Sequence, residues 1–282
     1  MGGVPRVVGW INRETCCGIA LARTGLAGTL ARNTRQERGA VLSNEAQIAV
    51  VILVRFPAGK KLRALQALTL GRFWLKSVDG LVFSRTLGSG AAGGFGSAPG
   101  LLNQGYFGTF RTKEQAAAFV SQSSYSKYLV AHGAEVFACV MQATALKGAW
   151  GGVAPCAVTC PAEVRGPIAA ITRATLRPSR AARFWRHAAP SQSQLETCDG
   201  CLLAAGLGEA PFIRQATFTI WRDLEAMSAY SATGAHGAAA RAARLEGYFS
   251  ESMFARFQIL YTRGTWRGFA LPAFDAPIAM DR

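Results

Sequence analysis

His236 stands among unusually small side chains, which makes it the first residue to consider for chemistry. Gly234 interrupts a helical pattern just before it, and alanines crowd around Arg241 and Arg244 in the stretch that follows. Small side chains let a flat ligand or another backbone approach closely, and a neutral imidazole can serve as the axial ligand of a metal ion. The competing interpretation is that His236 caps the helix or lies at the surface, and its spacing alone fits both.

Strands and a helix are predicted to frame this histidine. Thr alternates with large apolar residues from Ala216 to Trp221, which is typical of a strand with one covered face. Asp223 then stands where a helix start favours a carboxylate, and apolar residues recur at helical spacing up to Tyr230. A further strand is predicted over Met253–Tyr261. The histidine would therefore lie on a helical region that connects two strands of one sheet.

The cysteines and the Gly-rich segment offer weaker candidates. Cys156 with Cys160 and Cys198 with Cys201 could be drawn as a four-thiolate zinc site, but these spacings match none of the common patterns well. Seven cysteines, an odd number, with no secretory signal before them favour a reducing compartment. The segment GSGAAGGFGSAPG, at 88–100, joins two predicted strands and precedes no helix start, so we interpret it as a flexible lip and not as a phosphate-binding loop.

The composition limits the classes of partner. The chain has 282 residues and a formal net charge of +15, which would suit nucleic acid, an anionic membrane surface or an acidic protein. The basic residues form no run, and no zinc finger, RNP-like sequence or basic-region helix is present, so nucleic acid is not expected. A compositional bias towards Arg and Ala is an alternative origin of the charge. The strongest apolar run, Ile48–Val54, is far shorter than the roughly 20 residues that span a bilayer, so no membrane span is expected.

The pattern strand, helix, strand, strand, helix, strand occurs twice along the chain. Its first occurrence is predicted at Ile48–Phe56, Lys60–Lys76, Leu81–Leu87, Gln104–Phe110, Lys113–Ala131 and Glu135–Ala143. Its second occurrence is predicted at Ile168–Leu176, Ser179–Gln194, Cys201–Leu207, Ile213–Trp221, the helical region around His236, and Met253–Tyr261. We therefore predict an α+β fold of two tandem duplicated ferredoxin-like (βαββαβ) units whose sheets pack face to face with the helices outside.

The predicted domain boundaries follow from this repeat. An N-terminal extension covers 1–47, the first unit 48–150, a linker 151–165, the second unit 166–268 and a C-terminal tail 269–282. Short sequence echoes support a duplication, and they are RFW at 72–74 and 183–185, LG at 87–88 and 207–208, GTFR and TIWR at 108–111 and 219–222, and KGAWG and RGTWRG at 147–151 and 263–268. The RFW register places Tyr125 of the first unit opposite His236 of the second.

Several motifs in order resemble one known family. They are GPIAAITRATL (166–176), ARFWRH (182–187), GLGEAPFIRQATFTIW (206–221), GAHGAAARAARLEGYF (234–249) and ARFQILYTRGTWRG (255–268). Together they are similar to the spheroidene monooxygenase family, the acyclic carotenoid 2-ketolases. The resemblance implies a dimeric α+β barrel-like architecture, haem b as cofactor, and insertion of oxygen at C2 of an acyclic carotenoid such as spheroidene, with electrons from a reduced ferredoxin-like donor.

The resemblance also implies roles for individual residues. His236 would be the axial ligand of the haem iron, with Phe218, Trp221 and Phe257 as walls of the cofactor pocket. The opposite face of the iron would need one or two donors that steer cleavage of dioxygen, and Arg173, Arg214 and Gln215 lie on strands that could face this cavity. The alternative for each arginine is a salt bridge at the edge of a barrel.

Two classes of function remain open from the sequence. The first is a haem-dependent monooxygenase of carotenoid biosynthesis, and the second is a haem-binding or hydrophobic-ligand-binding protein on the same scaffold without oxygenase activity, since a fold does not determine its chemistry. We also expect the protein to be cytoplasmic, to form a homo-oligomer and to contact a membrane peripherally. A long polyene partitions into lipid, and a basic protein is attracted to an anionic surface through interactions that salt weakens.

Overall fold

The computed structural model describes residues 48–90, 99–158, 164, 166–210 and 212–271. The predictions for the N-terminal extension, for most of the Gly-rich segment, for Cys160 and for most of the C-terminal tail lie outside these residues.

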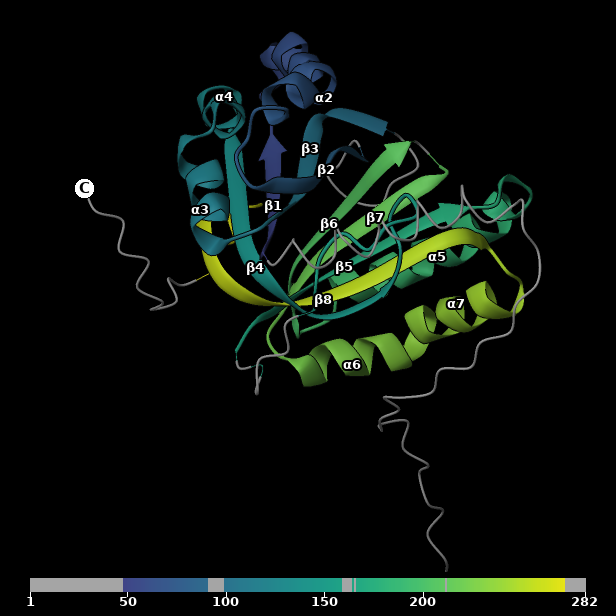
Figure 1. Ribbon diagram of the computed structural model, residues 1–282. Coiled ribbons are helices and arrows are strands. Elements are labelled where there is room, and N and C mark those ends of the chain that lie inside the picture. Colours follow the sequence, from purple (N-terminus) through teal and green to yellow (C-terminus); the bar gives the residue numbers. More distant parts are fainter. Residues whose placement is uncertain (1–47, 91–98, 159–163, 165, 211, 272–282) are drawn as a thin grey trace, which may run out of the picture.

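The described part of the chain has the same order of elements in each half (Figure 1). The first half comprises β1 (Ile48–Arg55), η1 (Ala58–Lys60), α2 (Lys61–Leu75), β2 (Leu81–Gly90), β3 (Pro99–Phe110), α3 (Lys113–Gln122), α4 (Ser124–His132) and β4 (Glu135–Gly148). The second half comprises β5 (Ile168–Leu176), η2 (Pro178–Arg180), α5 (Ala181–Glu196), β6 (Cys201–Ala210), β7 (Arg214–Trp221), α6 (Leu224–Ala232), α7 (Gly234–Leu245) and β8 (Phe249–Gly264).

One predicted helix is wrong and one predicted interruption is confirmed. The single helix expected over Lys113–Ala131 is two helices, because Ser123 adopts an extended backbone and its hydroxyl accepts a hydrogen bond from the backbone N–H of Ser126 (3.1 Å) as the N-cap of α4. The interruption expected at Gly234 is present, since α6 ends at Ala232 and α7 begins at Gly234. Both halves therefore carry two short helices between their third and fourth strands.

The strands close into one antiparallel barrel in the order β1-β3-β2-β6-β7-β5-β8-β4, which confirms the predicted α+β class. Within this order the first half contributes β4-β1-β3-β2 and the second half contributes β8-β5-β7-β6. The halves meet at two seams. Strands β4 and β8 pair from Phe137↔Gly264 to Gly148↔Met253, whereas β2 and β6 pair only at Gly88↔Gly208 and Ser89↔Leu207. One seam is therefore long and the other is short.

The side chains alternate between the barrel interior and the layer beneath the helices. Residues that point inward from both halves, including Val51, Phe107, Ile171 and Phe218, form one continuous apolar core. On the outer face of the first half, a second cluster of 17 buried residues lies beneath α2, α3 and α4. The corresponding cluster of the second half contains only four buried residues among the described side chains, and these are Ile168, Leu195, Trp221 and Tyr230. Figure 1 shows the helices outside the barrel.

A tryptophan turn follows each of the two strands at the long seam. Gly148 (φ 86°) and Gly264 (φ 81°) begin these turns, and Trp150 and Trp266 insert into the core of the barrel. The backbone N–H of each tryptophan donates at 2.9 Å to the backbone oxygen of the residue three positions later, which is Val153 in one turn and Phe269 in the other. The sequence echo between KGAWG and RGTWRG thus marks the same turn at two places in the barrel.

Each turn is held by a glutamate from the other half. Glu251 of β8 accepts hydrogen bonds from the backbone N–H groups of Gly151 (3.1 Å) and Gly152 (2.6 Å). Glu135 of β4 accepts from the backbone N–H of Gly268 (2.9 Å) and from the hydroxyl of Thr265 (3.0 Å). Because β4 and β8 are antiparallel, the start of one strand lies beside the end of the other, so this arrangement is reciprocal.

The RFW echo is out of register in the structure. Arg72–Trp74 lies at the end of α2, whereas Arg183–Trp185 lies at the start of α5. The register is given instead by η1 and η2, which precede these helices at the same distance, and by the Asp-Gly pairs at 79–80 and 199–200 that precede β2 and β6. Matching three-residue strings in the two helices therefore did not identify equivalent positions.

We expect Gly148→Ala to lower the free energy of unfolding by about 2 kcal/mol or more. Its φ is in the left-handed region, and a Cβ there would overlap the carbonyl oxygen of Ser252 across the long seam. Gly59→Ala is the control, because a Cβ at Gly59 meets nothing within 4 Å, and its effect should stay within about 0.5 kcal/mol. Urea denaturation of both variants measures the difference, and equal midpoints would contradict this account of the seam.

Candidate functional site

His236 lies in the first turn of α7, where polar groups from α5 hold it. Its Nδ1 is 3.0 Å from the hydroxyl of Ser191, and its backbone N–H donates to the side-chain oxygen of Gln194 (3.0 Å). The imidazole stacks on Tyr230 of α6, with ring centroids 4.5 Å apart, and the hydroxyl of Tyr230 donates to the backbone oxygen of Ser191 (3.1 Å). Tyr230 in turn contacts Trp221 of β7. The histidine is therefore fixed in place and does not cap the helix.

Burial lowers the pKa of His236 below its ordinary value. The imidazole is consequently neutral at pH 7, with one protonated ring nitrogen and one lone pair. If Nδ1 carries the proton and donates it to Ser191, the lone pair is on Nε2. Such a ring has the tautomer and the fixed orientation that a metal-ligating histidine requires.

The equivalent place in the first half is apolar. Gly71 of α2 and Ser191 of α5 both lie ten residues after the first residue of their helix. The ring of Tyr125 packs over Gly71, where an added Cβ would lie 2.8 Å from a ring carbon. Tyr125 therefore contacts α2 where His236 contacts α5, so the predicted correspondence of these two residues is observed although the RFW register that suggested it is wrong.

A second position of the first helix shows the same substitution. Trp74 and Gln194 both lie thirteen residues after the first residue of α2 and α5. Trp74 packs against Tyr125, with ring centroids 6.3 Å apart, whereas Gln194 binds the backbone of His236. An apolar contact in one half is thus a polar one in the other, at the same place in the fold. Ser191, Gln194 and Tyr230 were not predicted, and the signal for the first two was a pair of polar residues three apart on one helix.

The predicted walls of a cofactor pocket do not all border His236. Trp221 lies on the outer face of the sheet, in the same cluster as Tyr230. Phe218 and Phe257 point into the barrel and belong to its interior core, on the opposite face of the sheet. The prediction that these three side chains enclose one pocket with His236 is therefore wrong for Phe218 and Phe257, because neighbouring residues of a strand alternate between faces and both of these point inward.

Arg173 lies inside the barrel and is almost fully buried. Its guanidinium forms ion pairs with Glu251 and, at 3.1 Å, with Glu209, and Glu209 also pairs with Arg85 at 2.9 Å. The same Glu251 oxygen that meets Arg173 accepts from the backbone N–H of Gly151. The alternative predicted for Arg173 was a salt bridge at the edge of a barrel; the salt bridge is present, but it lies in the barrel interior.

The three predicted catalytic residues do not converge. Arg214 is exposed at the start of β7. Gln215 is half-buried, points away from the barrel interior and donates from its side-chain nitrogen to the backbone oxygen of Ala210 (3.5 Å). Arg173 points inward from β5, so the sheet separates it from both Gln215 and His236. The structure therefore offers no common site for these three residues.

Among the described residues, a buried arginine occurs at only one of the two pseudo-equivalent ends of the barrel, although each end has a glutamate, Glu135 or Glu251, beside its tryptophan turn. Leu53 pairs with the residue two places after Glu135, and Arg173 pairs with the residue two places after Glu251. Leu53 is fully buried in the apolar core, so a charge replaces an apolar side chain at the matching position. Two buried donors at this end, Nε of Arg173 and Nε1 of Trp150, have no hydrogen-bond partner among the described residues.

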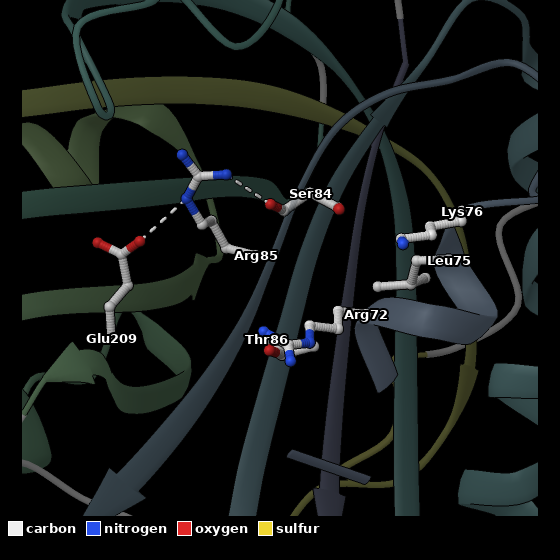
Figure 2. A pocket seen from close by; sticks show the side chains of 7 residues that line it. All are labelled: Arg72, Leu75, Lys76, Ser84, Arg85, Thr86 and Glu209. Carbon is white, nitrogen blue, oxygen red and sulfur yellow. Dashed lines mark hydrogen bonds and ion pairs between the residues drawn. The ribbon is translucent and has the colours of Figure 1, made fainter. Parts of the chain in front are cut away.

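A cavity of about 310 Å³ lies beside the short seam between β2 and β6 (Figure 2). Its lining residues are Arg72, Leu75 and Lys76 of α2, Ser84, Arg85 and Thr86 of β2, and Glu209 of β6. Figure 2 shows Arg85 directed towards Glu209. Three cations and one carboxylate line this space, and His236 is not among its lining residues.

Two further features concern only the described part of the chain. No group of three or more His, Cys, Asp or Glu side chains there could hold a metal ion. The four-cysteine zinc site considered from the sequence includes Cys160, which lies outside the described residues. None of the helices in that part is long and apolar enough to cross a bilayer.

Comparison with known proteins gives a consistent set of relatives. No protein-family model matches the chain. A spheroidene monooxygenase of Rubrivivax gelatinosus is 46% identical over 191 residues, which cover 67% of this chain and 73% of the relative. A spheroidene monooxygenase of Rhodobacter capsulatus is 32% identical over 225 residues, which cover 78% of this chain and 93% of the relative. A crystal structure of aldoxime dehydratase superposes with a TM-score of 0.54 over 77% of this chain and 82% of that one, and at 9% identity this likeness shows the fold alone.

We expect Arg173→Met to lower the free energy of unfolding by about 3 kcal/mol, because the change leaves two largely buried carboxylates without their shared cation. Arg222→Met is the matched control. Arg222 also binds two carboxylates, those of Asp199 and Asp223, but at the surface, so its loss should cost at most about 1 kcal/mol. Chemical denaturation measures both values. A cost for Arg173→Met no larger than that of the control would show that the interior ion pairs contribute little.

Proposed function

The chain belongs to the spheroidene monooxygenase family, and we propose that it inserts an oxygen atom at C2 of an acyclic carotenoid such as spheroidene, with haem b as its cofactor and a reduced ferredoxin-like protein as electron donor. The named relatives support the monooxygenase activity and the carotenoid class of substrate. The observation that carries the cofactor proposal is the replacement of the apolar Tyr125 contact of the first half by a fixed, neutral histidine in the second.

The donor chemistry around His236 fits a haem. A haem iron takes a neutral imidazole nitrogen, and the second nitrogen of such a ligand is normally bound by a neighbouring group that sets the tautomer. Here the hydroxyl oxygen of Ser191 lies 3.0 Å from Nδ1 and can accept a hydrogen bond from Nδ1–H, which directs the Nε2 lone pair away from α5. Tyr230 stacks on the ring and restricts its rotation. The residues that would hold the group are thus His236 as ligand, with Ser191 and Tyr230 as positioning residues.

The layer beneath the helices of the second half is consistent with an apolar cofactor. Its buried cluster of four residues is much smaller than the 17-residue cluster of the first half. The only fully buried residue of α7 is Gly237, and the rest of the described helix carries mainly alanine and arginine. A large planar group would therefore replace side chains that the first half provides for itself, such as Phe119 and Tyr106.

When bound, haem would supply the activation of dioxygen. The chain would contribute a ring nitrogen of His236 as ligand, its tautomer fixed through Ser191, and the apolar surfaces of Trp221 and Tyr230 that exclude water. We assign no step to Arg173, Arg214 or Gln215, because Arg173 lies on the other face of the sheet and the other two do not approach His236.

We further propose that the two halves are tandem ferredoxin-like units, at about 48–150 and 166–268, that descend from a duplication and form a dimeric α+β barrel-like architecture within one chain. The repeated order of strands and the reciprocal tryptophan turns support this proposal. Within such a pair, one copy would have kept an apolar helix contact while the other acquired the histidine.

His236→Ala should abolish retention of haem in protein produced with an adequate haem supply, because it removes the proposed ligand of the iron. His132→Ala is the matched control, since His132 lies on the corresponding second helix of the first half, packed edge-on against Tyr128, and should keep haem unchanged. Soret absorbance, haem content and thermal unfolding would be measured together. Retention of the native spectrum and haem content by His236→Ala, with loss in His132→Ala, would transfer the site to the first half.

Turnover separates the oxygenase from a ligand-binding protein on the same scaffold. Haem-loaded protein with spheroidene, oxygen and a reductant should yield the ketone at C2, and a protein that binds haem and carotenoid without forming any product would contradict the proposed reaction.

Ser191→Ala tests the positioning role of Ser191. We expect it to keep His236 as ligand but to weaken haem binding by roughly tenfold or more, as for other losses of a ligand's hydrogen-bond partner.

A further inference from the structure

Helix α2 exposes four large apolar side chains on its outer side, with Gln66 and Thr69 between them. Its buried residues are Ala64, Ala67, Gly71 and Leu75, which lie against the barrel. On the outside, Leu62 is 67% exposed, Leu65 45%, Leu70 44% and Phe73 50%. Leu62, Leu65 and Phe73 recur at spacings of three and eight residues, so they lie on one side of the helix. Large apolar side chains gathered on one exposed face are characteristic of surfaces that contact a partner or a membrane.

Cations surround this apolar face. The stretch from Lys60 to Lys76 contains five basic residues and no acidic one, and its members are Lys60, Lys61, Arg63, Arg72 and Lys76. The guanidinium carbon of Arg72 lies 4.9 Å and the Nζ of Lys76 lies 5.2 Å from the ring centroid of Phe73. Long cationic side chains beside a half-exposed aromatic ring are the arrangement found where a helix meets lipid headgroups.

The cavity at the short seam is lined by three cationic side chains and could therefore bind an anionic group of a membrane. Arg72 and Lys76, at the end of α2, line it together with Arg85, and Ser84 and Thr86 supply polar groups (Figure 2). Its single carboxylate, Glu209, is already paired with Arg85 and with Arg173. Neither Arg72 nor Lys76 forms an ion pair within the described residues. Two cations therefore remain available for an anion, and a volume of about 310 Å³ can admit a phosphodiester group.

The equivalent helix of the second half lacks this face. The positions that correspond to Leu62, Leu65, Leu70 and Phe73, counted from the helix start, carry Ala182, Trp185, Pro190 and Ser193 in α5. Trp185 is also engaged, because its indole N–H donates to the backbone oxygen of Phe212 (3.3 Å). The apolar, cationic surface is therefore not required by the fold, which both halves share. Figure 1 shows α2 on the side of the barrel opposite α6 and α7, so this surface is separate from the His236 site.

We propose that α2 docks the protein on an anionic phospholipid bilayer, with Leu62, Leu65 and Phe73 in the headgroup region and a lipid phosphate in the cavity formed by Arg72, Lys76 and Arg85. Charge complementarity selects this occupant, since the helix has only basic charged residues and the chain carries a formal net charge of +15. The inference goes beyond the proposed reaction and does not depend on haem. It does place the protein where a long, apolar substrate is dissolved.

Flotation of the full-length protein with vesicles tests the docking surface. One set of vesicles contains phosphatidylcholine alone, and the other contains equal amounts of phosphatidylcholine and phosphatidylglycerol. We expect binding to the anionic set to fall as salt rises, and Arg72→Glu with Lys76→Glu to weaken it by about tenfold or more. Leu65→Ser with Phe73→Ser should weaken binding to a similar extent at every salt concentration, because it removes apolar insertion.

Matched controls come from the second half. Arg241→Glu with Arg244→Glu makes the same change of charge on α7, and Leu224→Ser with Leu245→Ser removes two exposed leucines from α6 and α7. Neither pair should change vesicle binding by more than about twofold. Thermal unfolding confirms that each variant is folded, and its haem content is read separately, so failure of docking and failure of the proposed cofactor are distinguishable.

Three outcomes would overturn the proposal. The first is equal binding to both sets of vesicles, unaffected by salt or by the α2 variants. The second is an equal loss in the α2 and control variants, which would mean that net charge alone drives adsorption. The third is that the α2 variants change the oligomeric state in sedimentation experiments while vesicle binding stays the same, which would make this face an interface between copies of the chain. Competition by free inorganic phosphate, without any effect of lipid, would assign the cavity to a soluble anion and also reject docking.

Discussion

The pairing of β4 with β8 is the constraint on which the rest of the barrel depends. It runs from Phe137↔Gly264 to Gly148↔Met253 and joins the last strand of each half over most of its length. Because the strands are antiparallel, each places its first glutamate beside the turn that ends the other. Glu135 and Glu251 thereby hold the turns whose tryptophans enter the core. The opposite seam has only two residue pairs, so the fold is secured mainly from one side.

The same scaffold position serves opposite purposes in the two halves. In the first half, Tyr125 packs over Gly71 within a large apolar cluster, so protein side chains alone fill that layer. In the second half, His236 faces Ser191 at the same place, and the apolar cluster that includes Tyr230 has only four buried residues among the described side chains. An incomplete core is costly when it stays empty, because buried apolar surface is the main stabilising term of a fold. The loss is offset where a bound group supplies that surface.

The charges inside the barrel follow a comparable asymmetry. Arg173 takes the position that Leu53 occupies in the other half, and it is compensated by Glu209 and Glu251. Such a buried pair contributes little net stability, yet the loss of one member is costly because its partner stays desolvated. Arg85 links this interior set to the cavity at the short seam, where the barrel is least tightly joined. The polar interior and the basic surface of α2 therefore meet at the same edge of the molecule.

The sequence by itself determined the α+β class, the order of strands and helices, the break at Gly234 and the candidate histidine, because hydrophobic periodicity and turn residues act locally. The family resemblance rested on the same local strings. It could not determine which side chains share a space. Phe218 was placed with His236 although one sheet separates them, RFW was aligned although it lies at opposite ends of two helices, and Arg173 was grouped with Gln215 although they point to opposite faces. These relations depend on strand pairing between residues more than a hundred positions apart, such as Phe137 and Gly264, and on closure of the barrel, which fixes the face on which each side chain lies.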